Sequence, residues 1–191
     1  MKINSLQDLY VEQLRDLYDA ENQLIKALPK MAEAASSDDL RQGFEDHLEQ
    51  TRGHVQRLET IFAKLGEKPK REKCKGMEGL VKEGSEVLEE DMDENVKEAA
   101  IIAAAQRVEH YEIAGYGPVR TFANLLGDRE AALLLQQTLD EEKETDQQLS
   151  ELAEDINIEA EHETEGIDDT EDTENQDRVQ SRTSARKKPA A

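Results

Sequence analysis

Apolar residues recur at alternating intervals of three and four positions in two long stretches of the first half of the chain, the spacing of helices that bury one face. The first stretch begins after Ser5, which together with Asp8 resembles a capping box, and runs to about Ala35. The second runs from about Asp38 to Gly66, and glycine adopts the left-handed conformation that often ends a helix. These patterns predict two helices joined by a very short turn.

The second half of the chain repeats this arrangement. Helical spacing covers residues 98–126, which end before Gly127, and again about 129–156. The polar residues 67–95 between the two pairs contain a modest amphipathic stretch, which predicts a long connection with one short helix. Pro29 lies inside the first stretch, where its missing amide predicts a kink and not an end.

The two halves align without gaps at an offset of 91 residues, which places Glu21 on Glu112 and Leu58 on Leu149. The chain is therefore expected to form two similar helical hairpins. The connection between them is long enough to cross the length of a bundle, and one such crossover distinguishes ferritin-like folds from simple up-and-down bundles. The sequence predicts an all-α fold, a ferritin-like four-helix bundle with a long crossover and a short extra helix.

The amino-acid composition is typical of a helical protein, and it differs between the first 156 residues and the rest of the chain. Aromatic residues make up only 4% and Trp is absent, while strong helix formers dominate. Residues 1–156 are expected to form one bundle domain. Residues 157–191 carry almost nothing apolar, are first acidic and then basic, and are predicted to be a disordered tail.

The formal net charge of -21 narrows the possible partners. Such a surface repels nucleic acid and anionic membranes, so cations are the favoured small partners. The basic end SARKKPAA could touch an anionic partner such as DNA, but the acidic run before it opposes this. The single Cys74, the polar N-terminus and the lack of an apolar run of membrane-spanning length favour a reduced, cytoplasmic setting without membrane association.

Polar residues interrupt the apolar face of each predicted long helix, and they do so at corresponding positions in the two halves of the chain. Counting equal distances outward from the two short turns puts Glu21 level with residue 52, between Thr51 and His54, and puts Glu112 level with Glu142. The internal repeat sets both pairs at one height. These four side chains are therefore expected to converge inside the bundle.

Carboxylates that meet inside a bundle repel one another strongly unless a positive charge lies between them. No Lys or Arg occupies a neighbouring seam position in this sequence. A pair of metal ions would resolve the conflict, and carboxylates with imidazole suit iron or manganese. The alternative is that the glutamates lie at the rim of the bundle or stay protonated.

Three further residues complete the candidate metal site. His47 is two turns from His54 on the same seam, so it is either a second ligand or a hydrogen-bonded core residue. Glu109 and Asp146 lie one helical step from the expected centre and could be ligands, partners of ligands or surface charges. The candidate metal ligands are Glu21, His47, His54, Glu109, Glu112, Glu142 and Asp146. The residues that would act in catalysis stay open.

Five segments, in order along the chain, carry a family resemblance: DLYDAENQLIKALPKMAEAA, FEDHLEQTRGHVQRLE, CKGMEGL, AAAQRVEHYEIAGYG and LQQTLDEEKETDQQL. Over about residues 3–156 the sequence resembles the YciE/YciF-type stress-associated branch of the ferritin-like superfamily. The resemblance implies a helical bundle with a dimetal centre, stress-linked expression and self-association, with a homodimer as the expected assembly. It implies no settled reaction.

The resemblance also implies a ligand set. The residues that lie in matching motifs are Glu21, His47, Glu109, Glu112 and Glu142. The general ferritin-like pattern Glu-x-x-His on the second and fourth helices is only half kept. The second helix has Thr51 and His54 at these positions, and the fourth has Glu142 and Thr145.

Two functions are compatible with these observations. The first is a dimetal-carboxylate protein that holds two metal ions, iron or else manganese, and reacts iron with oxygen or peroxide. The second is a non-catalytic helical scaffold or stress partner, whose bundle holds no stable metal because the ligand pattern is incomplete. The metal content of the purified protein discriminates between them.

Overall fold

The computed structural model describes the backbone of residues 3–69 and 72–184, and side chains as far as residue 162. These ranges form helices without any strand: α1 (Leu6–Ala34), α2 (Asp38–Leu65), α3 (Lys75–Glu89), α4 (Glu94–Leu125) and α5 (Arg129–Ser184). Within the described ranges, every helix is too short or too polar to cross a lipid bilayer. The all-α prediction is confirmed.

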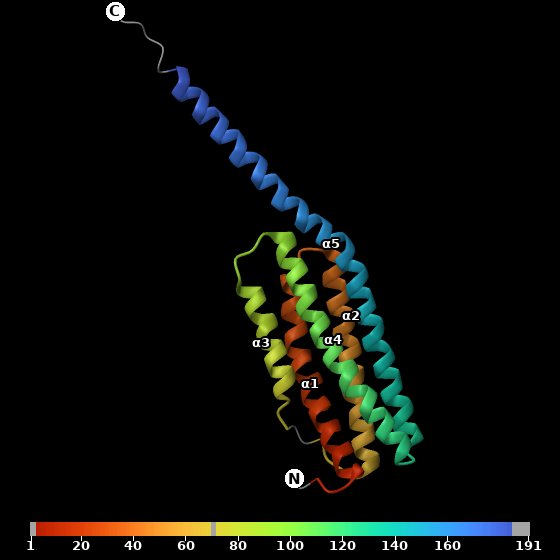
Figure 1. The fold of residues 1–191 in the computed structure, drawn as a ribbon. Helices are drawn as coiled ribbons and strands as arrows, with labels where there is room; N and C mark the ends of the chain where they lie inside the picture. The colour runs from red at the N-terminus through yellow and green to blue at the C-terminus, as the bar shows by residue number, and fades with distance from the viewer. Residues whose placement is uncertain (1–2, 70–71, 185–191) are drawn as a thin grey trace, which may run out of the picture.

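Four long helices lie side by side as a bundle, and α3 lies along its outside (Figure 1). Helix α1 packs against α2, and α4 packs against α5. The two hairpins meet through α1 against α4 and through α2 against α5, while α3 packs on α1 and α4. The long connection thus returns along the bundle and contains the short extra helix that the sequence predicts.

The helix ends follow from local hydrogen bonds. Ser5 Oγ accepts from the amide of Asp8 at 3.0 Å, and the Asp8 carboxylate accepts from the Asn4 amide at 3.0 Å. This is the reciprocal arrangement of a capping box, displaced by one residue. Ser37 Oγ caps α2 in the same way, and Gly66 ends that helix with a φ of 67°.

Two boundaries differ from the sequence-based expectation. Helix α4 begins at Glu94, four residues before the apolar seam begins, because the seam marks burial and not the first helical turn. Helix α5 continues to Ser184, whereas its end was expected near Ile156 with disorder beyond (Figure 1). The segment has few apolar residues but is rich in Glu and free of Pro, and extending an existing helix avoids the cost of nucleation.

The proposed division into a bundle over residues 1–156 and a tail over residues 157–191 stays a prediction. The helix beyond the bundle projects away from the other four (Figure 1). The last seven residues, 185–191, which include part of the basic end, lie outside the described residues.

The bundle interior consists of two apolar clusters with a polar layer between them. One cluster surrounds Phe44 and the other surrounds Phe62, toward opposite ends of α2. On α1, Leu17 belongs to the second cluster and Leu24 to the first, and the buried Glu21 lies between them. The same order holds on the other three long helices, so apolar packing on both sides fixes the height of the polar layer.

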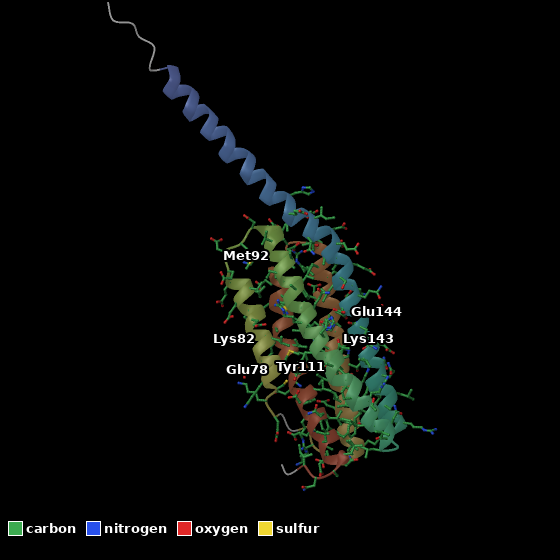
Figure 2. All side chains as sticks on the ribbon, in the orientation of Figure 1. Glu78, Lys82, Met92, Tyr111, Lys143 and Glu144 are labelled. Carbon is green, nitrogen blue, oxygen red and sulfur yellow. The ribbon has the colours of Figure 1, made fainter. Side chains whose placement is uncertain are left out.

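The start of α3 docks closely on α4 through a small polar contact. Cys74 Sγ lies 2.9 Å from the hydroxyl of Tyr111, and this hydroxyl donates to Asp16 at 2.8 Å. Tyr111 is labelled in Figure 2. The Cys74 thiol also caps α3 by accepting from the Met77 amide. A Cβ atom on Gly76 would lie 2.5 Å from a Tyr111 ring carbon, so this position requires glycine.

Two alanine substitutions in α3 test this contact. Gly79→Ala is expected to raise the free energy of unfolding by about 0.5–1 kcal/mol, because nothing obstructs its Cβ and alanine favours helix. Gly76→Ala should lower that free energy by about 1 kcal/mol or more, because it displaces the Tyr111 ring. Urea unfolding measures both variants. Equal stabilisation by the two substitutions would contradict the close approach of α3 and α4.

Candidate metal centre

The polar layer contains six buried side chains that could act as metal ligands. Each of the four long helices contributes at least one of them, and none is more than 3% exposed: Glu21, His47, His54, Glu109, Glu112 and Glu142. They form two overlapping groups whose nitrogen and oxygen atoms lie within 4.8 Å of one another. We call these six residues the Glu–His cluster.

The first group is Glu21, His54 and Glu142. His54 Nδ1 lies 3.4 Å from a Glu21 carboxylate oxygen and 3.0 Å from a Glu142 oxygen. The other Glu21 oxygen accepts a hydrogen bond from the Tyr116 hydroxyl. This hydroxyl orients the Glu21 carboxylate and leaves its second oxygen directed toward the histidine.

The second group is His47, Glu109, Glu112 and Glu142. His47 Nε2 lies 3.3 Å from a Glu109 oxygen and 4.0 Å from a Glu142 oxygen. Glu142 therefore belongs to both groups, and its two oxygens are directed toward different histidines. A carboxylate in this position can bridge two ions.

Both histidines of α2 reach the cluster, which their spacing of two helical turns allows. Their ring centroids are 6.3 Å apart. His54 presents Nδ1 to the glutamates, whereas His47 presents Nε2. The sequence left open which of the two faces the centre, and the structure places both there.

The outward nitrogen of each histidine is held by polar groups around the cluster. His54 Nε2 lies 2.9 Å from the Glu141 carboxylate. That carboxylate accepts hydrogen bonds from two Arg57 nitrogens at 2.6 and 2.8 Å. Since Glu141 can only accept, Nε2 of His54 carries a proton. His47 Nδ1 lies 3.3 Å from both the Gln50 side-chain oxygen and the Thr145 hydroxyl. These contacts fix the orientation of both rings.

Burial and like charge dominate the electrostatics of the cluster. Burial, followed by the charge of Glu142, raises the pKa values of Glu109 and Glu112 well above the ordinary range. Burial alone would lower the pKa of His54, but the charges of Glu21 and Glu142 outweigh it and raise that pKa to about 11. The cluster thus attracts positive charge, supplied either by protons or by metal ions.

Six carboxylate oxygens of the cluster have no hydrogen-bond donor at good geometry within the described part of the chain, although two of them face His54 Nδ1. The six oxygens are Glu21 Oε2, Glu109 Oε2 and both oxygens of Glu112 and of Glu142. No Lys or Arg nitrogen lies within ion-pairing distance of these four glutamates in the described ranges. Buried oxygens in this state are costly, and a cation between them removes the cost. The donor set of carboxylates and imidazoles suits iron or manganese.

One residue predicted as a ligand lies apart from the cluster. Asp146 is on α5, where its carboxylate accepts from Gln106 and lies 3.3 Å from His110 Nε2. It is half-buried and belongs to neither group of possible ligands. One helical step along α5 turns its side chain away from the interior, where Glu142 points.

Sequence reasoning missed three residues that support the cluster. Tyr116 lies one turn after Glu112, a spacing that could have identified it, but tyrosine on an apolar seam is more often a packing residue. Arg57 and Glu141 gave no signal, because they come from different helices and their pairing is visible only in the tertiary structure. Tyr18 and Gln50 contact Glu59 and His47.

A protein family described as a domain of unknown function, DUF892, matches residues 5–161 of the chain. Protein YciF of Escherichia coli (strain K12) is 47% identical over 154 residues, which is 80% of this chain and 93% of that protein. The crystal structure of the E. coli stress protein YciF matches with a TM-score of 0.79 at 46% identity, covering 81% of this chain and 98% of that one. The resemblance to YciE/YciF-type proteins is thereby confirmed.

Two structures of lower identity share the fold. Ferritin-like, diiron-carboxylate proteins from Bacillus anthracis match with a TM-score of 0.62 at 17% identity, over 79% of this chain and 99% of that one. A dodecameric thioferritin from Bacteroides fragilis, described as bacterioferritin-related, matches with a TM-score of 0.64 at 20% identity, over 83% and 91%. The predicted ferritin-like architecture is confirmed.

The raised pKa of Glu112 predicts how pH affects the metal-free protein. In chelator, Glu112→Gln is expected to raise the melting temperature by about 2–4 °C near pH 8, the shift that roughly 1 kcal/mol produces at this size. The stability contributed by protonated Glu112 is present below its unfolded pKa of about 4.3 and is lost as pH rises through the higher folded pKa. Glutamine stays neutral, so it avoids this loss.

Thermal unfolding at a series of pH values, from about 5 to about 8, measures the effect. The advantage of the variant should grow with pH. Glu154→Gln, at an exposed position on α5, is the matched control and should show no such growth. A variant that melts below the wild type near neutral pH in chelator would contradict the cost assigned to the buried Glu112 carboxylate.

Proposed function

This chain belongs to the DUF892 family, and we propose that its bundle binds two metal ions in the Glu–His cluster, with iron as the expected metal and manganese as the alternative. The observation that carries this proposal is the set of six buried carboxylate oxygens that lack a hydrogen-bond donor at good geometry in the described part of the chain. Two divalent ions would neutralise four buried carboxylates and give these oxygens their partners.

The two groups of side chains indicate how the ions would be shared. Glu21 and His54 would hold one ion, while His47, Glu109 and Glu112 would hold the other. Glu142, which belongs to both groups, would bridge the pair. The second helix thus supplies a histidine to each ion, which replaces the Glu-x-x-His pattern that the sequence keeps only in part.

The proposed reaction is the oxidation of ferrous iron by oxygen or peroxide in a stress response. The support is the ferritin-like fold, the description of the E. coli relative as a stress protein, and that of the Bacillus anthracis proteins as diiron-carboxylate. When bound, a ferrous pair would supply the electrons for this chemistry. A cytoplasmic location and assembly into a homodimer belong to the same proposal.

The chain's own residues would prepare the site for that chemistry. Burial, followed by the charge of Glu21, raises the pKa of Tyr116, so its hydroxyl keeps its proton and stays a donor to Glu21. Glu141 and Arg57 hold His54 in place through its outer nitrogen. The two apolar clusters exclude water from above and below the polar layer.

A specific observation also favours the scaffold alternative. The raised pKa values of Glu109 and Glu112 allow both carboxyls to be neutral, and protons would then take the place of metal ions. In that case the bundle would persist without metal, and its fold would serve a non-catalytic role. Metal content distinguishes the two functions directly.

The chain is expected to bind about two ferrous ions under anaerobic conditions, the number that a carboxylate-bridged pair requires. The double variant Glu112→Ala with Glu142→Ala should abolish this binding, because Glu142 belongs to both groups of possible ligands and Glu112 to one of them. Isothermal titration and elemental analysis measure the stoichiometry. Asp146→Asn is the control, because the Asp146 carboxylate contacts Gln106 and His110 and belongs to neither group of possible ligands, and it should still bind about two ions.

Three results would count against the proposal. A wild-type protein that binds no iron or manganese, with a melting temperature insensitive to either, favours the scaffold. Unchanged binding in the double variant rejects the assigned ligands. Loss of one ion in Asp146→Asn would restore Asp146 to the ligand set.

The contact between His54 and Glu141 makes a separate prediction. Glu141→Gln is expected to weaken metal binding by about 10–100-fold, because it removes the anion that orients the outer nitrogen of His54 and pairs with Arg57. Competition with a chelator of known affinity measures the change. Glu144→Gln, on the exposed side of the same helix, is the matched control and should bind normally (Figure 2). Equal affinity in the two variants would contradict the role given to Glu141.

A further inference from the structure

A groove runs along the surface between α2 and α5 and ends at the Glu–His cluster. Its volume is about 620 Å³, and its lining comes from α2, α4, α5 and the turn before α2. Two members of the cluster, His47 and Glu109, form part of its wall. At the outer side the exposed Asp39, Asp46 and Asp155 also line it. We call this feature the acidic groove.

The inner wall of the acidic groove presents buried polar atoms that have no hydrogen-bond partner. His47 is 3% exposed and Glu109 is 2% exposed, yet His47 Nε2 and Glu109 Oε2 make no hydrogen bond in the described structure. Both atoms belong to a group that could hold a metal ion. The groove therefore connects solvent to unsatisfied ligand atoms, which distinguishes it from an ordinary surface depression.

The charge of the acidic groove selects the kind of particle that it can admit. Seven of its lining residues are Asp or Glu, and among the lining residues there is no Lys or Arg. A cleft lined by charge of one sign concentrates oppositely charged ions and raises their rate of arrival. A second cavity, between α1 and α3, is mostly apolar, contains Lys26 and Lys30, and touches no member of the cluster.

The size of the acidic groove also fits a hydrated cation. An ion with six water molecules occupies about 180 Å³, since each water takes up about 30 Å³. The groove is several times larger than this, so its volume accommodates the ion together with its waters, which carboxylate oxygens would then replace. The lining carboxylates include exposed ones, such as Asp155, and buried ones, such as Glu98 and Glu109.

We propose that the acidic groove is the route by which divalent cations reach and leave the Glu–His cluster. This inference rests on the proposed metal binding and adds a path to it. Exposed carboxylates attract the hydrated ion, and His47 and Glu109 are the first ligands of the cluster that it meets. The two metal ions would thus enter the cluster from the side formed by α2 and α5.

Gly43 provides a way to obstruct the groove without altering a ligand. It lines the groove on α2, one helical turn before His47, and a Cβ built there meets nothing within 4 Å. A large side chain at this position would extend into the groove outside His47. Gly43→Phe is therefore expected to narrow the route, whereas Gly43→Ala leaves it open and favours the helix.

Stopped-flow mixing with Co²⁺, whose absorption reports its ligands, measures how fast the cluster fills. Gly43→Phe should slow filling on the order of tenfold, whereas Gly43→Ala should fill within about twofold of the wild-type rate. Both variants should bind as many ions at equilibrium as the wild type, because no ligand is changed. Thermal unfolding in chelator checks that each variant is folded.

A second set of variants tests the charge of the groove independently of its width. The triple replacement Asp46→Asn, Glu151→Gln and Asp155→Asn should slow Co²⁺ filling about 3–10-fold at low salt. The difference should shrink toward about 0.5 M salt, where exposed charges are screened. The matched control neutralises three exposed glutamates elsewhere on the surface: Glu33→Gln, Glu45→Gln and Glu83→Gln.

The possible results separate the route from the metal site itself. Slower filling with an unchanged number of bound ions supports the route. Wild-type filling rates in Gly43→Phe and in the groove triple variant would overturn it while leaving the metal site intact. Equal slowing by both triple variants would reduce the effect to net charge and would also overturn the route. If the wild-type protein binds no Co²⁺, Fe²⁺ or Mn²⁺, the proposed function fails and the route fails with it.

Discussion

Repulsion among the buried carboxylates of the polar layer is the constraint on which the rest of the structure depends. Glu21, Glu112 and Glu142 are fully buried at one height of the bundle, where each unpaired charge is costly. Two apolar clusters, one on each side, hold the four helices together and keep these side chains in place. Burial of apolar surface thus stabilises an arrangement that the carboxylates alone would disrupt.

Side chains around the polar layer reduce the energetic cost of its buried charges and orient its ligands. Arg57 neutralises Glu141, which in turn holds the outer nitrogen of His54, so the arginine charge lies beside the cluster and not inside it. Tyr116 donates to Glu21 from within the second apolar cluster. The interior remains short of positive charge as a result. A site of this kind binds cations because the fold leaves its negative charge incompletely compensated.

Much of the fold and most of the candidate site followed from patterns along the chain. Helical spacing predicted the bounds of α1, α2 and α4 and the start of α5 to within a few residues, since burial of one face imposes its period on the sequence. The repeat that places Glu21 on Glu112 set the height at which the carboxylates meet. The end of α5 at Ser184 did not follow, because apolar periodicity disappears where a helix leaves the bundle although helix propensity persists.

The sequence by itself determined the helices, the two hairpins and the level of the polar layer, because these depend on spacing within one helix or on counting from a short turn. Only the tertiary structure decided which side chains turn inward together. It brought both His47 and His54 to the cluster, left Asp146 outside, and joined Arg57 to Glu141 across two helices. The rotation of each helix about its own axis governs these contacts, and that rotation is fixed by packing against all its neighbours at once.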